Sequence, residues 1–142
     1  MLLVLAGYAV ASVLAPWLVR RLGAGAFVPL ALVPGGAFAV TAVIGPTVRS
    51  GQAYAETTPW IPGLDVELAF RVDTLAWVMS LLVSGIGALV LYYCAHYFTD
   101  EEPELGRFAG VLVAFAGAMQ GLVAADNLLV LYVFWEATTV FS

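Results

Sequence analysis

The chain has 142 residues, of which 63% are apolar and 11% are charged, and its formal net charge is −5. A typical soluble domain is about half apolar and a quarter charged, so the composition indicates a polytopic membrane protein and excludes a compact soluble domain. The five basic residues form no basic tail, which argues against nucleic acid as a partner. The single Cys94 and the single His96 make no metal or haem cluster, so we expect no metal site and no cofactor.

The first two predicted membrane helices cover residues 1–19 and 24–48. The first has no basic residue ahead of its apolar run, unlike a signal peptide, and it ends at Arg20-Arg21. That arginine pair favours the cytoplasmic side, which puts the N-terminus outside. In the second helix, Pro34-Gly35-Gly36 is expected to kink or unwind the backbone. We interpret the motif as an ordinary kink or an early helix start, because Pro and Gly are common in membrane helices. An unwound segment of the kind that forms ion sites in some transporters is the alternative.

The one substantial loop covers residues 49–72 and is expected to lie outside. Apolar and polar residues alternate over residues 64–72, which predicts a short strand or hairpin. The Pro-Trp-Ile-Pro-Gly sequence at residues 59–63 predicts a turn. Trp60 and Phe70 suit a membrane interface.

Two further helices are predicted for residues 73–94 and 107–125, and both carry small residues at helical spacing. Asp73 with Thr74 is expected to cap the earlier helix, and Gln120 in the later one should seek a polar partner. The small-residue face of the first comprises Ser80, Ser84, Gly87 and Ala88. That of the second comprises Gly106, Gly110, Ala114 and Ala118, with Gly117 and Gly121 on a neighbouring stripe. Such faces are typical of close helix packing in membranes.

The loop between these helices, residues 95–107, is expected inside and carries an acidic run at residues 100–104. We interpret the run as a solvated loop face, with a cation funnel as the alternative. His96 lies at the membrane boundary. Water can satisfy it there, and a proton relay is the alternative.

A fifth helix is predicted for residues 127–142, with Asp126 and Asn127 in its capping turn. Its only charged side chain is Glu136, about 13 Å along the helix and so near the middle of a hydrocarbon core about 30 Å thick. A carboxylate at that depth is costly and is a functional candidate by default. Helical geometry places Tyr132 and Thr139 on the same face. Two interpretations follow: proton or cation translocation, or a neutral glutamate that hydrogen-bonds another helix for assembly.

At Ser142 this fifth helix is only about 24 Å long, which is short of a full crossing. The sequence therefore predicts an all-α transmembrane bundle of about five helices, the last one truncated. We expect residues 1–142 to form the N-terminal transmembrane segment of a larger subunit.

Three stretches resemble one family, the antiporter-like subunits of proton pumps. Residues 70–77 (Phe-Arg-Val-Asp-Thr-Leu-Ala-Trp) are similar to its "F-R-x-D-G-L" motif, and residues 84–93 continue that signature. Residues 125–139 (Ala-Asp-Asn-Leu-Leu-Val-Leu-Tyr-Val-Phe-Trp-Glu-Ala-Thr-Thr) are similar to "S-D-N-L-x-x-L-Y-x-F-W-E-L-T-S". The family includes the large membrane subunits of respiratory complex I and the A and D subunits of Mrp-type antiporters. The resemblance is to the Mrp A subunit in particular, with departures at Thr74, Ala137 and Thr139.

The resemblance implies that Glu136 pairs with a lysine on a later helix and tunes its proton affinity, with Trp135 packed beside it. The site expected is thus Glu136, supported by Trp135, Tyr132, Thr139 and Asp73. The implied activity is Na⁺/H⁺ exchange driven by the proton gradient, in a multisubunit complex of the cell inner (plasma) membrane. The implied partners are other antiporter subunits, the lipid bilayer, Na⁺ and H⁺. A proton-pumping subunit of complex I or a related hydrogenase is one alternative, and a non-transporting assembly subunit is another.

Overall fold

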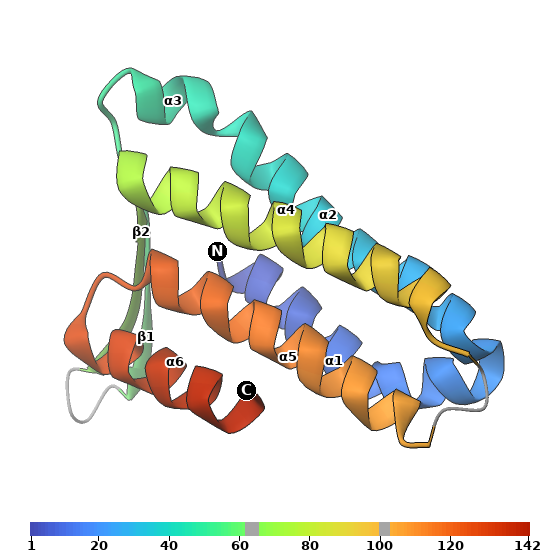
Figure 1. The fold of residues 1–142 in the computed structure, drawn as a ribbon. Helices are drawn as coiled ribbons and strands as arrows, with labels where there is room; N and C mark the ends of the chain where they lie inside the picture. The colour runs from blue at the N-terminus through green and yellow to red at the C-terminus, as the bar shows by residue number, and fades with distance from the viewer. Residues whose placement is uncertain (62–65, 100–102) are drawn as a thin grey trace.

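The structure, a computed structural model, describes residues 1–61, 66–99 and 103–142. It is a bundle of helices closed at one end by a β-hairpin (Figure 1). In chain order the elements are α1 (Leu2–Leu22), the 3₁₀ turn η1 (Gly23–Ala26), α2 (Phe27–Val43), α3 (Gly45–Arg49), β1 (Tyr54–Ile61), β2 (Val66–Val72), α4 (Thr74–Tyr97), α5 (Leu105–Ala124) and α6 (Leu128–Phe141). The predicted helical membrane bundle is confirmed, and the hairpin is the only β-sheet among the described residues.

Three described stretches are long and apolar enough to cross a membrane: Leu2–Val43, Thr74–Tyr97 and Leu105–Ala124. The first contains both α1 and α2, which run in opposite directions and join through η1 (Figure 1). Gly23 takes a positive φ of 59° at that reversal, a conformation that side chains disfavour. The apolar α6 is shorter than these spans.

Helix α2 does not unwind at Pro34-Gly35-Gly36, so the alternative of an unwound segment was wrong. The helix is continuous from Phe27 to Val43, and the break comes at Ile44, between α2 and α3. Pro34 is buried against α4, where a Cβ on Gly87 would lie 3.5 Å from it. Pro46 lacks the N–H that would continue the helical ladder, which explains the interruption just before it.

The hairpin pairs β1 with β2 in antiparallel register, from Tyr54 opposite Val72 onward. The strand predicted from the alternation is confirmed as β2, whose Phe70 and Val72 are buried. Phe70 is therefore a core residue, and its predicted interfacial position was wrong. Residues 59–61, predicted as part of a turn, belong to β1. Pro59 is accommodated there because the register is irregular between Pro59 and Ile61, where the ladder does not need its missing N–H. The remainder of that predicted turn, residues 62 and 63, lies outside the described residues.

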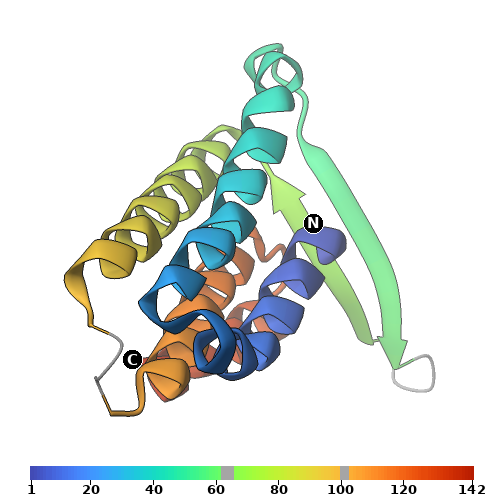
Figure 2. The ribbon, with the colours of Figure 1, turned by 90° about the vertical axis from the view of Figure 1, so that its right-hand side faces the viewer.

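The hairpin is attached to the start of α6 by three contacts. Phe70 forms an isolated bridge with Ala125, and the Asp126 N–H donates to the Ala69 carbonyl over 3.0 Å. The Asn127 side chain donates to the Glu67 carbonyl over 2.9 Å. Asn127 also caps α6 by accepting from the Val130 N–H, whereas Asp126, predicted as a capping residue, only contributes its backbone to β2. Figure 2 shows the two strands of the hairpin beside the N-terminus.

Helices α1 and α5 pack closely through the predicted small-residue face of α5 and through Gly117 of the neighbouring stripe. A Cβ on Gly110 would lie 2.9 Å from the Ser12 carbonyl oxygen, and one on Gly117 would lie 2.7 Å from Tyr8 Cβ. Approach this close, to the backbone at Gly110 and to a side chain at Gly117, is possible only where the side chain is a hydrogen. On the other side of the bundle, α2 packs on α4, and the Trp77 indole N–H donates to the Thr41 carbonyl over 2.8 Å.

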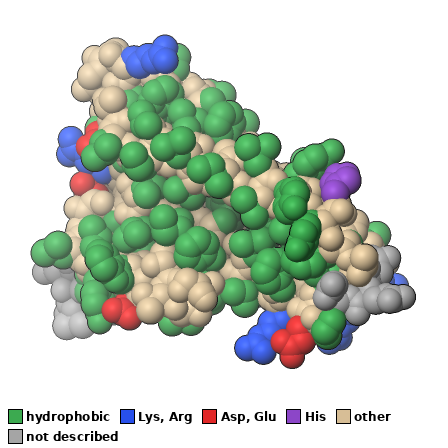
Figure 3. Space-filling model, in the orientation of Figure 1, with side chains coloured by type: hydrophobic (Ala, Val, Ile, Leu, Met, Phe, Trp, Pro, Cys, Tyr) green, Lys and Arg blue, Asp and Glu red, His purple; other side chains and the backbone are tan. Residues whose placement is uncertain are grey.

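The outer surface is that of a membrane protein. Apolar side chains cover most of the face seen in Figure 3, and the arginines and His96 lie towards its ends. The end that carries Arg20 and Arg21 is also the end where α4 finishes and α5 begins, as the predicted alternation of helix directions requires.

Candidate functional site

Helix α6 has one face in the bundle and one face outside it. Its inner face consists of the fully buried Val130 and the partly buried Phe134, Ala137 and Phe141. These residues recur every three or four positions, as expected for one side of a helix. The outer face includes Tyr132 and Trp135, whose exposed fractions are 63% and 59%. The structure therefore places Tyr132 and Trp135 on the free side of α6 and the phenylalanines on its inner side.

Glu136 lies on this outer face and is exposed. It is about 12 Å along the helix from Leu128, which is close to the predicted depth. The expected burial of the carboxylate is not provided by the other helices described, because α6 turns it away from α5. Within the described residues, Glu136 has no ion pair. A second charged group must approach this face if the carboxylate is to be paired inside a membrane.

The residues predicted to support Glu136 divide into two groups. Tyr132 and Thr139 are exposed one turn before and after it, as predicted from helical spacing. The Thr138 and Thr139 hydroxyls donate to the Trp135 carbonyl, at 2.7 and 3.4 Å, so neither is committed to the carboxylate. Asp73 is not brought to the site. It caps α4 by accepting from the Ala76 N–H over 2.9 Å, which confirms its predicted capping role.

The orientation of α6 depends on a contact that the sequence did not reveal. The Phe134 ring lies directly against Gly121 of α5, where a Cβ would overlap the ring. The same ring is 6.0 Å from the ring of Phe70, centre to centre, with the planes tilted by 60°. The neighbouring glycine stripe, Gly117 and Gly121, was the only signal in the sequence for this arrangement.

A second polar feature lies in the interior of the bundle. Ser80, Ser84 and Gln120 are fully buried, and the Ser84 hydroxyl donates to the Ser80 carbonyl over 2.6 Å. Within the described part of the chain, both polar atoms of the Gln120 side chain and the hydroxyls of Tyr8 and Ser80 have no hydrogen-bond partner. The polar partner expected for Gln120 is thus not found among these residues. His96 is exposed at the Arg20 end of the bundle, and its ring lies 4.9 Å from the Tyr92 ring, centre to centre.

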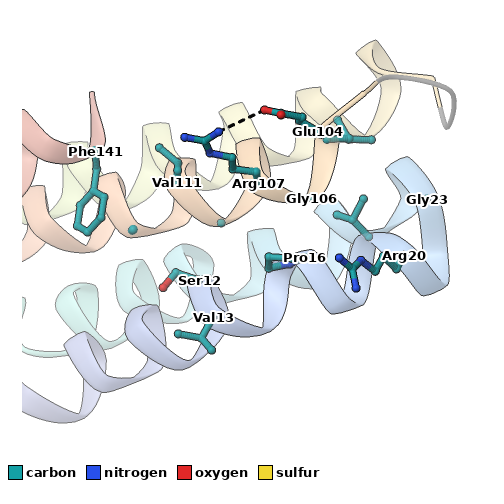
Figure 4. A pocket seen from close by; sticks show the side chains of 14 residues that line it. Ser12, Val13, Pro16, Arg20, Gly23, Glu104, Gly106, Arg107, Val111 and Phe141 are labelled. Carbon is teal, nitrogen blue, oxygen red and sulfur yellow. Dashed lines mark hydrogen bonds and ion pairs between the residues drawn. The ribbon is translucent and has the colours of Figure 1, made fainter.

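A groove of about 1100 Å³ lies between α1 and α5, distinct from the outer face of α6. Figure 4 shows Arg20 and Arg107 towards one end of the groove and Phe141 of α6 towards the other. Arg107 is 3.5 Å from the carboxylate of Glu104, and both side chains are exposed. Glu104 is the described part of the predicted acidic run, and residues 100–102 of that run lie outside the described residues.

The chain was compared with known families, sequences and structures. Residues 60–109 match the family described as NADH-ubiquinone oxidoreductase (complex I), chain 5 N-terminus. The chain is 42% identical over 93 residues to the A subunit of the Na⁺/H⁺ antiporter of Alkalihalophilus pseudofirmus, a match that covers 66% of this chain and 12% of that protein. It is 40% identical over 105 residues to the A/B subunit of a "Probable K(+)/H(+) antiporter" of Rhizobium meliloti, covering 74% of this chain and 10% of that one.

A chain in the solved structure of the Mrp complex from Dietzia sp. DQ12-45-1b has the same fold. The two superpose with a TM-score of 0.85 and 36% sequence identity, over 98% of this chain and 15% of the other. The hairpin and the helices described above therefore belong to a fold already seen inside a multisubunit membrane complex. The chain spans about a tenth of the length of the curated relatives that it matches.

Proposed function

We propose that this chain, a member of the antiporter-like membrane-subunit family that includes the A subunit of Mrp antiporters, contributes Glu136 to proton-coupled cation exchange. The observation that supports the proposal is the position of Glu136: a carboxylate at mid-helix depth on the free face of α6, with no ion pair among the described residues. A charge in that position is too costly to keep in lipid unless another group of the assembled protein approaches it.

In the proposed mechanism, a lysine elsewhere in the intact protein approaches the outer face of α6. While Glu136 is ionised, it favours the charged form of that lysine and raises its proton affinity. A change in the distance between the two groups lowers that affinity and releases the proton. Trp135, Tyr132 and Thr139 lie beside the carboxylate on the same exposed face.

The exchanged ion is a monovalent cation, with Na⁺ as our first choice. Of the two relatives compared, one is named for Na⁺/H⁺ exchange and the other for K⁺/H⁺ exchange. We place the chain in the plasma membrane as one subunit of a hetero-oligomeric complex. Its N-terminus and hairpin lie outside, because Arg20 and Arg21 mark the opposite end as cytoplasmic. This assignment makes the chain part of a secondary transporter and not an enzyme.

A second candidate is favoured by the match of residues 60–109 to the N-terminus of complex I chain 5. In that case the same glutamate serves a redox-driven proton pump. The two candidates differ in what drives proton movement. An antiporter needs an imposed proton gradient and an added cation, whereas the pump needs a quinone-linked reductant.

The test uses the intact complex in sealed vesicles, with cation-dependent proton movement as the measurement. We expect Glu136→Gln to assemble at the normal level and to lose most of its exchange activity. Glu104→Gln is the matched control, because Glu104 is exposed at the far end of the bundle and should leave exchange unchanged. Normal exchange in Glu136→Gln would refute the proposal. Loss of assembly without a change in exchange per assembled complex would favour a purely structural role.

A further inference from the structure

We infer that Gly121 is a positioning residue for Glu136: its contact with Phe134 sets the rotation of α6 about its own axis and so the direction in which the carboxylate points. This inference rests on the proposed function of Glu136. Its geometric part, the direction of position 136, stands on the contacts of α5 and α6 alone.

The first step is the absence of space at position 121. Gly121 is buried in α5, and the ring of Phe134 occupies the place where its Cβ would be. Any larger residue at position 121 must move that ring or the helix that carries it. Ala, the smallest such change, adds a single methyl group.

The second step is that the ring has little freedom to retreat. Phe134 packs into the cluster around Phe70, Ala124 and Val130, in which all three residues are at most 2% exposed. Phe70 in turn is fixed by the pairing of β2 with β1 and by its bridge to Ala125. The ring of Phe134 is thus enclosed between α5 and the hairpin. Closely packed interiors resist such displacement and transmit it to neighbouring elements.

The third step connects the ring to the carboxylate. Successive residues of a helix are about 100° apart, so Phe134 and Glu136 point in nearly opposite directions. A rotation that moves the ring away from Gly121 therefore turns Glu136 by the same angle on the outer side. Charge interactions depend on distance, so such a turn changes the strength of any pairing at the carboxylate.

The contrast with Gly117 makes the inference specific. Gly117 lies one turn earlier on α5 and also makes a close contact, but with Tyr8 of α1. Enlarging residue 117 should separate α1 from α5 without turning α6. The two glycines thus offer matched variants, of which only one bears on Glu136.

The experiment measures two properties of the intact complex. The first is the reaction rate of a small thiol reagent with Glu136→Cys, in a Cys94→Ala background, and it reports the environment of position 136 without any need for transport. The second is the pH dependence of exchange with Glu136 present. We expect Gly121→Ala to change the thiol reaction rate several-fold. We also expect it to shift the pH dependence and to lower exchange about tenfold, since small misplacements of a reacting group have large effects on rate.

Rescue provides the decisive arm. Phe134→Leu removes the ring atoms that a methyl group at position 121 would meet, so the double variant Gly121→Ala/Phe134→Leu should recover both the thiol rate and the pH profile. Gly117→Ala should reduce the amount of assembled complex but leave both properties of the remainder unchanged. Gly36→Ala, where a Cβ meets nothing within 4 Å, is the control for the substitution itself.

The outcomes distinguish the positioning role of Gly121 from the function proposed for Glu136. An unchanged thiol rate at position 136 in assembled Gly121→Ala would overturn the positioning role, whatever happens to exchange. If Gly121→Ala does not assemble, Phe134→Ala becomes the test, because it releases the same contact and should alter the same two properties. A changed thiol rate together with normal exchange in Glu136→Gln would retain the positioning role and refute the function proposed for the glutamate.

Discussion

Helices α5 and α6 are neighbours of similar apolar character, yet they differ in how deeply they are buried in the bundle. Ten residues of α5 are buried, on several sides of the helix, whereas Val130 is the one buried residue of α6. Helix α5 is thus the interior support of the fold, and its sequence of glycine and alanine is shaped by close neighbours. Helix α6 contributes one side to packing and leaves the other exposed. The more deeply buried of the two helices is therefore not the one that carries the candidate site residue, Glu136.

The comparison predicts that enlarging a glycine of α5 lowers the stability of the bundle more than any other change considered. Gly110→Leu should destabilise the bundle by about 3 kcal/mol or more, because the new side chain meets the backbone carbonyl of Ser12, which cannot move aside. Thermal unfolding of the purified protein or complex measures this. Gly7→Leu on α1, where a Cβ meets nothing within 4 Å, should have little effect. Equal losses from the two variants would remove the distinction between packed and free glycines.

The attachment of α6 is expected to be the next most sensitive point. Asn127→Ala should cost about 1–2 kcal/mol, because the helix loses its cap and the hairpin loses a hydrogen bond to the Glu67 carbonyl. Asn127→Asp keeps an acceptor for the cap but cannot donate to Glu67, so its loss should be intermediate. Leu128→Ala, at an 84% exposed position, is the control. If all three variants unfold at the same temperature, α6 is not held through its first residues.

A smaller, pH-dependent effect is expected where the hairpin meets α1. A hydrogen bond from the Met1 ammonium group lowers the pKa of Glu56, and the nearby positive charge and the Leu2 N–H act in the same direction. A lowered folded-state pKa means that this contribution to stability is present above the unfolded pKa of about 4.3 and is lost as the pH falls through the lower, folded value. The contribution should be about 1 kcal/mol or less. Unfolding measured from pH 6 downward should show it, and Glu56→Gln should abolish that part of the pH dependence.

The smallest effect is expected at the opposite end of the bundle. Arg107→Ala should change stability by no more than about 0.5 kcal/mol, because its ion pair with Glu104 spans 3.5 Å between two exposed side chains. Thermal unfolding at low and high salt checks this. A loss comparable to that of Asn127→Ala would show that this end of α5 is also held by specific polar contacts.

The sequence predicts those features that are determined locally. The helices follow from their apolar runs, the caps at Asp73 and Asn127 follow from residue type, and strand β2 follows from alternation. Strand β1 does not follow from the local sequence, because Pro59 and its neighbours favour a turn. Pairing with β2 overrides that preference in the folded protein. The continuity of α2 through Pro34 likewise depends on packing against α4, which no local pattern encodes.

The candidate site likewise has some features that the sequence predicts and some that it does not. The depth of Glu136 and the presence of Tyr132 and Thr139 on its face follow from helical geometry. The direction in which that face points does not, because it depends on the register between α5 and α6 and hence on Gly121 and Phe134. That register is a long-range property, and a periodic sequence pattern carries no information about which neighbour a face will meet.

The bond between Asn127 and the Glu67 carbonyl also bears on how the protein is made, since it joins residues 60 positions apart. A ribosome completes the hairpin well before it completes α6, and a membrane helix can insert before its final neighbours are in place. Insertion of α6 and its fixation are therefore separate events, and the second waits for the hairpin to fold. Mutations that slow hairpin formation should accordingly leave a period during biogenesis in which α6 is in the bilayer but free to slide and turn.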